Sequence, residues 1–121
     1  MSGRLVLCGS GEFTTAMDAL DTELLAGLRP RAKVAIVPTA AGLEDTPARW
    51  GEMGCAHFRA LGAEAVPLMV LDRRDANEPR WTDALADVDW IYFSGGDPGH
   101  LVETLEGSAF WTAVLARHRH G

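Results

Sequence analysis

The feature that most constrains the fold is an apolar run that ends at two consecutive glycines. Residues 88–93 are mostly apolar, and Ser94-Gly95-Gly96-Asp97-Pro98 follows them directly. An apolar run of this length is typical of a strand buried in a parallel sheet. Asp97 is predicted to be the N-cap of a helix whose first residue is Pro98. Residues 90–101 are therefore predicted to form a strand, a glycine turn and a helix that make one wall of a ligand site.

Other apolar runs alternate with helix-like segments along the chain. Strands are predicted at residues 4–8, 33–37 and 64–71, besides 88–93, and the strand within 64–71 is expected to be interrupted at Pro67 or to start late because of it. Apolar residues at three- and four-residue intervals predict helices over residues 14–28, 46–62 (with Thr46 as N-cap), 81–86, and from 98 to the C-terminus with a break at 107–108. This alternation predicts an α/β fold with a doubly wound, mainly parallel sheet and helices on both faces, in one domain over residues 1–121.

Three loops of small residues are expected to meet at one edge of this sheet. They are residues 9–13, 39–41 and 94–97, and each follows a predicted strand. The carboxyl ends of parallel strands lie at the same edge, where sheets of this kind bind ligands. For a single loop, the favoured interpretation of a glycine is only that it turns the chain. Three such loops together favour a ligand site, because they leave a crevice lined by backbone N–H groups.

The composition argues against several classes of partner and cofactor. The chain has 17 acidic and 11 basic residues and a formal net charge of −6, which disfavours binding to nucleic acid or to an anionic membrane. No stretch reaches the ~20 apolar residues that cross a bilayer, so a cytoplasmic protein is expected. Cys8 and Cys55 are expected to be small buried hydrophobic residues. No group of residues has metal-ligand spacing, and no cofactor is expected.

A dinucleotide site is the first alternative for the loop at residues 9–13. Gly9-Ser10-Gly11 partly suits the G-x-G-x-x-G pattern, but Thr14 stands where the third glycine belongs. Asp18 and Asp21, early in the following helix, would repel a pyrophosphate. The acidic residue expected at the end of the second strand is also missing. Dinucleotide binding is therefore disfavoured.

Residues 90–101 and 105–108 closely resemble the aspartyl dipeptidase and cyanophycinase family. Members of this family are serine peptidases built on the class I glutamine amidotransferase-like fold. Residues 9–13 resemble the family's glycine-rich first loop, and residues 37–41 resemble the segment at the end of its second strand. Residues 58–62 match a common helix end. The likeness is collinear over nearly the whole chain, and the Gly-Gly-Asp segment is its most specific part.

The resemblance implies a role for each small-residue loop. Backbone N–H groups of Gly95 and Gly96 are expected to form an oxyanion hole, since amides fixed at such a turn can point at a developing alkoxide. The residues expected to contact the substrate are Asp97, His100, Ser10, Gly11 and Thr39. For Asp97, a purely structural role as N-cap is an equally open alternative.

The catalytic serine of that family has no counterpart here. None of the four serines, Ser2, Ser10, Ser94 and Ser108, stands in a G-x-S-x-G setting. The family's nucleophile, histidine and acid are expected beyond residue 121, so the chain is expected to be the N-terminal half of a hydrolase for small peptides or amides, inactive alone. It would pair with a C-terminal portion or form a homo-oligomer. The alternative is a non-catalytic α/β module that binds a small ligand or self-associates.

Overall fold

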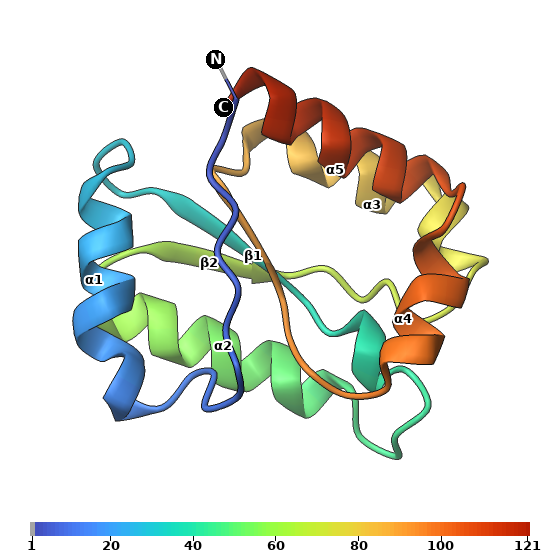
Figure 1. Cartoon of the computed structure of the whole chain (residues 1–121), viewed down its shortest axis with the longest axis horizontal. Helices are drawn as coiled ribbons and strands as arrows, with labels where there is room; N and C mark the ends of the chain where they lie inside the picture. Colours follow the sequence, from blue (N-terminus) through green and yellow to red (C-terminus); the bar gives the residue numbers. More distant parts are fainter. Residues whose placement is uncertain (1) are drawn as a thin grey trace.

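Three parallel strands form the central sheet of the computed structural model, which describes residues 2–121 (Figure 1). They are β1 (Lys33–Val37), β2 (Glu64–Pro67) and β3 (Trp90–Phe93), in the spatial order β2-β1-β3. In the register, Lys33 of β1 lies opposite Glu64 of β2, and Val34 of β1 lies opposite Trp90 of β3. β1 is therefore the central strand, and its residues 34–37 are completely buried.

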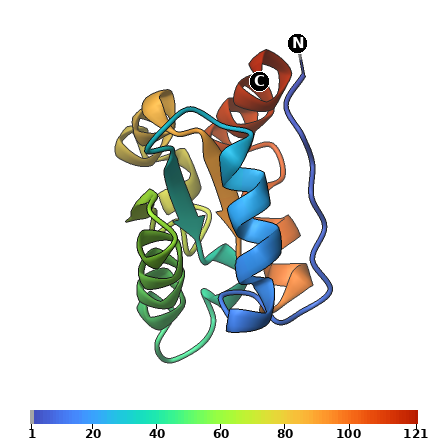
Figure 2. The same cartoon turned by 90° about the vertical axis from the view of Figure 1, so that its left-hand side faces the viewer.

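Helices cover both faces of this sheet, as Figures 1 and 2 show. On one face, α1 (Asp18–Ala26) contributes Leu25 and α2 (Ala48–Ala60) contributes Phe58. On the other face lie α3 (Pro79–Asp83), α4 (Pro98–Leu105) and α5 (Ala109–His120). Short 3-10 segments connect these elements: η1 (Thr15–Met17), η2 (Thr39–Ala41), η3 (Asp75–Asn77) and η4 (Ala84–Asp87). The prediction of a doubly wound α/β fold is confirmed.

Alternate residues of β1 pack into two separate hydrophobic clusters. Ile36 joins the cluster that contains Phe58 of α2, whereas Val37 joins the cluster that contains Phe110 of α5. Successive side chains of a strand point to opposite faces, so one short strand supplies both layers. Phe58 and Phe110 are fully buried, and burying each contributes about 1.5–3 kcal/mol.

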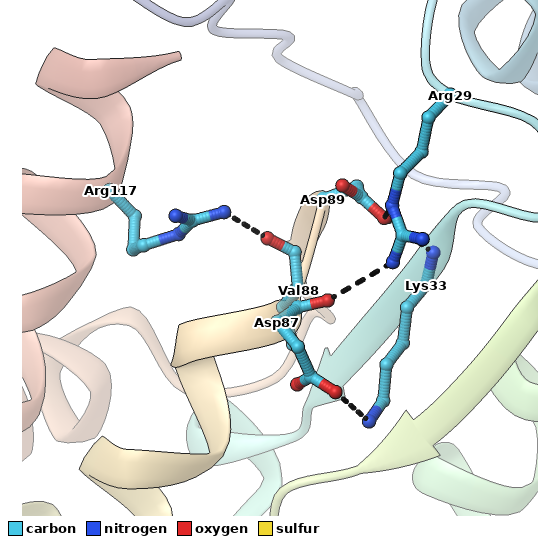
Figure 3. Close-up of polar contacts among 6 residues, drawn as sticks. All are labelled: Arg29, Lys33, Asp87, Val88, Asp89 and Arg117. Atoms are coloured by element: carbon cyan, nitrogen blue, oxygen red, sulfur yellow. Dashed lines mark hydrogen bonds and ion pairs between the residues drawn. The ribbon is translucent and has the colours of Figure 1, made fainter.

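Charged side chains tie the amino end of β3 to its surroundings (Figure 3). The Asp89 carboxylate accepts hydrogen bonds from Arg29 Nε at 2.7 Å and from the Lys33 backbone N–H at 2.9 Å. Lys33 Nζ donates to Asp87 at 3.0 Å, and this hydrogen bond lowers the pKa of the Asp87 carboxyl. Arg117 of α5 donates to the Val88 carbonyl at 2.6 Å. These contacts hold β3 against β1 at the edge opposite to the predicted ligand site.

Residues 4–8 form no strand, so the prediction of a buried first strand is wrong. Leu5 and Leu7 are 77% and 87% exposed, and Cys8 is exposed as well, contrary to expectation. A strand forms only where a partner takes its backbone hydrogen bonds. β1 has a strand on each side, but residues 4–8 pair neither with the outer edge of β2 nor with that of β3, and within residues 2–121 no ladder includes them. The preceding Gly3 N–H donates instead to the His118 carbonyl at 2.5 Å, beside the C-terminal end (Figure 1).

Several element boundaries also differ from the prediction. The strand expected over residues 64–71 ends at Pro67. The Leu68 N–H still donates to the Ile36 carbonyl at 2.8 Å, but the Val70 N–H turns back to the Leu68 carbonyl, so the pairing with β1 stops there. The strand expected over residues 88–93 begins only at Trp90, and the helix expected over 81–86 runs instead from Pro79 to Asp83. Helix α2 begins at Ala48, so Pro47, not Thr46, takes the N-cap position and offers no side-chain acceptor.

Side-chain caps define the starts of α4 and α5 as predicted. Asp97 Oδ1 accepts the His100 backbone N–H at 3.1 Å, and Pro98 is the first residue of α4. After the expected break at Gly107, Ser108 Oγ accepts the Trp111 N–H at 3.1 Å. Such a cap contributes ~1 kcal/mol to helix stability. Within the described chain, no helix combines the length and apolar character that crossing a bilayer requires.

Candidate ligand site at the turn between β3 and α4

The three predicted loops meet at the carboxyl edge of the sheet. The Asp97 N–H donates to the Ala40 carbonyl in η2 at 2.7 Å. The Gly95 N–H donates to Glu12 Oε2, in the loop at residues 9–13, at 2.8 Å. Each of the other two loops therefore holds the turn between β3 and α4 by one hydrogen bond.

Gly96 occupies a position that only glycine can fill. Its φ of 152° lies in a region that other residues rarely adopt. A Cβ placed on Gly96 would lie 2.3 Å from the Ala40 carbonyl oxygen and 2.9 Å from the Ala41 nitrogen. The absence of a side chain thus lets the turn approach the backbone of η2 closely.

Among the three successive amides of the turn, one donor is open. The Gly95 N–H is taken by Glu12, and the Asp97 N–H is taken by Ala40. The Gly96 N–H has no acceptor within residues 2–121. Of the two amides predicted for an oxyanion hole, Gly96 is therefore available to a ligand oxygen, whereas Gly95 already carries a carboxylate.

The side chains of Asp97 and His100 both have partners inside the protein. Asp97 caps α4, as described above. The His100 ring nitrogen Nε2 lies 2.7 Å from the Leu71 carbonyl oxygen and 3.4 Å from Thr104 Oγ1. These contacts join α4 to the chain that follows β2. Contact of either side chain with a substrate stays a prediction.

Ser10 and Gly11 form an exposed, tightly turned segment. Both have positive φ angles, 83° and 78°, and Phe13 has a φ of 64°. A non-glycine residue in this region costs about 1–3 kcal/mol, which the surrounding contacts must offset. Thr14 Oγ1 donates to the Gly11 carbonyl at 2.6 Å and closes the turn. The structure thus places both predicted residues beside Glu12, on the loop that reaches the turn.

Two buried hydroxyl groups follow β1 and β3 at the same edge. Thr39 is completely buried and Ser94 is 3% exposed. Neither hydroxyl has a hydrogen-bond partner within residues 2–121. Buried polar groups are nearly always paired, so two unpaired hydroxyls at one edge are unusual. Because both hydroxyls are buried, contact of Thr39 with a substrate stays a prediction.

Glu12 is the site residue that sequence reasoning missed. The glycines on either side of Ser10 indicate Ser10 and Gly11 as site residues, but they do not indicate the acidic residue that follows. A carboxylate directly after a glycine-rich turn, and before an aromatic residue that anchors the chain, was the available signal.

Other buried polar groups take no part in the hydrogen bonds that join the three loops. His57 Nε2 and Asp21 Oδ2 are 2.7 Å apart, and both side chains are buried between α1 and α2. Burial raises the pKa of the Cys55 thiol, and Cys55 is buried as predicted, so it is unsuited to act as a nucleophile. Burial also raises the pKa of the Tyr92 phenol. Within residues 2–121, no three His, Cys, Asp or Glu side chains are grouped to hold a metal ion.

Comparison with known proteins identifies relatives of this chain. The sequence model of Peptidase family S51 matches residues 5–121. A solved structure, a peptidase from an acI-B1 Actinobacterium, is 34% identical and superposes with a TM-score of 0.90. That match covers 100% of this chain and 52% of the solved one, so the chain spans about half the length of that peptidase. No curated protein matches the chain. On the strength of the family match, the chain belongs to peptidase family S51.

Proposed function

We propose that this chain supplies the oxyanion side of a serine peptidase site that acts on small peptides or amides. The observation that carries the proposal is the open Gly96 N–H at the carboxyl end of β3. When a nucleophile attacks a peptide carbonyl, negative charge develops on the carbonyl oxygen, and a fixed N–H nearby stabilises that charge. One such donor contributes about 3–4 kcal/mol to the transition state.

The nucleophile of the proposed reaction comes from outside residues 2–121. No serine of this chain has a G-x-S-x-G setting, and Ser94, which lies nearest the turn in sequence, is buried. The solved relative is about twice as long as this chain. We therefore propose that the activity requires a further segment carrying the serine and its base, and that the 121 residues alone are inactive.

The substrates that we propose are α- and β-aspartyl dipeptides, from the resemblance of residues 90–101 to aspartyl dipeptidases and cyanophycinases. The test is to express the complete open reading frame of the gene and the 121-residue chain separately. Release of free aspartate from both types of dipeptide would be measured for each product. We expect the longer product to hydrolyse at least one dipeptide and to react with a fluorophosphonate, and the 121-residue chain to do neither. A reading frame without a downstream G-x-S-x-G segment would refute the proposal, as would turnover by the short chain.

A self-associating module is the second candidate. β3 is an edge strand, and next to it lies an apolar groove of about 440 Å³, lined in part by Phe93, Leu101 and Trp111. On the same groove, Val102 is 58% exposed. An unpaired strand edge continuous with an apolar groove favours pairing with a second copy of the chain. Sedimentation equilibrium of the 121-residue chain should then show a dimer at micromolar concentration, and a stable monomer would exclude this candidate.

A further inference from the structure

Glu12 and Gly95 form a contact between parts of the chain that are 83 residues apart. Glu12 Oε2 accepts the Gly95 N–H at 2.8 Å, and no cation is bonded to this carboxylate within residues 2–121. A distance of 2.8 Å is that of a well-formed hydrogen bond. Glu12 therefore fixes the orientation of the peptide that enters the turn.

The loop around Glu12 is anchored on its C-terminal side. The ring of Phe13 packs into the cluster under α2, with its centroid 4.9 Å from that of Tyr92 and 6.4 Å from that of Phe58. On the N-terminal side, Gly11 is bonded to Thr14 as described above. The packing of Phe13 and the closed turn between Gly11 and Thr14 therefore direct the Glu12 side chain at Gly95.

A second acceptor holds the same turn from η2. The Ala40 carbonyl accepts the Asp97 N–H, and it also approaches the space where a Gly96 side chain would lie. Glu12 and Ala40 thus bind the amides before and after Gly96. Between these two bonded amides lies the Gly96 N–H, and its direction is set by the positions of Gly95 and Asp97.

We propose that Glu12 is a positioning residue for the Gly96 N–H. By accepting the Gly95 N–H, Glu12 fixes the turn so that Gly96 donates to a ligand oxygen, and Gly95 itself does not. The catalytic meaning of this inference rests on the proposed function, whereas the contact between Glu12 and the turn does not. The role is that of a hydrogen-bond acceptor. A negative charge near a developing oxyanion is unfavourable, so the charge of Glu12 is not what the site requires.

The first experiment needs no enzymatic activity. In the product of the complete reading frame, NMR would follow hydrogen exchange at the Gly95 and Gly96 amides. In E12A, exchange at Gly95 should accelerate about fivefold to tenfold, in line with the loss of one hydrogen bond. E12Q should retain most of the protection, because glutamine keeps an acceptor. Glu23→Ala, an exposed glutamate on α1, is the matched control.

The second experiment measures kcat and KM for the dipeptide that the product hydrolyses. E12A should lower kcat about tenfold to a hundredfold with little change in KM, since a misdirected donor weakens the transition state more than binding. E12Q should match or exceed the unaltered protein.

Each other result has a definite meaning. A rate of hydrogen exchange at the Gly95 amide that is unchanged in E12A would overturn the inference. Faster turnover in E12A would show that Glu12 competes with the substrate, and loss of kcat in E12Q equal to that in E12A would show that charge matters; either result overturns the positioning role. If the unaltered protein is inactive on all dipeptides, the proposed function fails, and the amide measurements still decide whether Glu12 fixes the turn.

Discussion

The two ends of β3 are held in different ways, although a carboxylate binds a backbone N–H at each. At the amino end, Asp89 accepts the Lys33 N–H and is also paired with Arg29, so its charge is compensated. At the carboxyl end, Glu12 accepts the Gly95 N–H without a cation bonded to it among the described residues. At the amino end, the charged side chains hold β3 against β1. The carboxyl end is held by the bonds of the Gly95 and Asp97 amides and leaves one donor, the Gly96 N–H, without an acceptor among the described residues.

The largest effect on stability should come from adding a side chain at Gly96, in the turn at the carboxyl end of β3. Gly96→Ala would set a Cβ 2.3 Å from the Ala40 oxygen at a φ that alanine rarely adopts, so the turn or η2 must move. We expect a loss of about 3 kcal/mol or more in the free energy of unfolding, from overpacking and backbone strain together. Urea denaturation would measure it. Gly9→Ala meets no atom within 4 Å and should change stability by less than about 0.5 kcal/mol. Equal stability of the two variants would contradict the described turn.

An intermediate effect on stability should follow from removing the Asp89 carboxylate at the amino end of β3. Asp89→Ala leaves the Lys33 N–H and the Arg29 guanidinium without their shared acceptor, next to a strand that is otherwise buried. We expect a loss of about 1.5–3 kcal/mol, the range for hydrogen bonds to a charged group. The control is Asp83→Ala, at an exposed position of α3, which should lower stability by less than about 0.5 kcal/mol in the same urea titration. The amide signals of Gly95 and Gly96 should stay unchanged in Asp89→Ala, because the two ends are held independently.

The smallest effect concerns the pH dependence of the amino end. The pKa of Asp87 is lowered in the folded protein, chiefly by the hydrogen bond from Lys33. A lowered pKa means that the group stabilises the fold at pH values above its unfolded pKa, about 3.9 for aspartate. This contribution is lost as the pH falls through the folded value. Lys33→Met should therefore make the melting temperature fall slightly less steeply on acidification. Because the Asp87 side chain is mostly exposed, the expected change is small, and an unchanged slope within error would mean that solvent screens the pair completely.

The parts of the fold that depend on neighbouring residues could be predicted from the sequence. The strand at residues 33–37 is a run of apolar residues closed by a proline, and its boundaries were predicted as they stand in the structure. Asp97 and Ser108 were identified as helix starts because a cap acts on an amide only three residues away. The meeting of three loops at one edge followed from the parallel alternation of strands and helices.

The parts that depend on distant partners could not be predicted. Residues 4–8 have the composition of a strand, but whether they form one is decided by whether a distant strand takes their backbone hydrogen bonds, and none does so within residues 2–121. The contact between Glu12 and Gly95 joins residues 83 positions apart, and no local pattern indicates which carboxylate reaches which amide. For the same reason, the sequence predicted two open donors at Gly95 and Gly96, without showing that one of them is used internally.

The hydrogen bond between Gly3 and His118 brings the beginning and the end of the described chain within a few ångströms of each other (Figure 1). Two fluorescent dyes attached near residues 3 and 118 would therefore transfer energy efficiently in the native state and poorly in the unfolded one. Such a pair would report the integrity of the whole fold in a single-molecule measurement, without labelling any residue of the turn. The same closeness makes the chain suited to circular permutation, since a short peptide could join these positions and new ends could be opened in the exposed loop at residues 43–46.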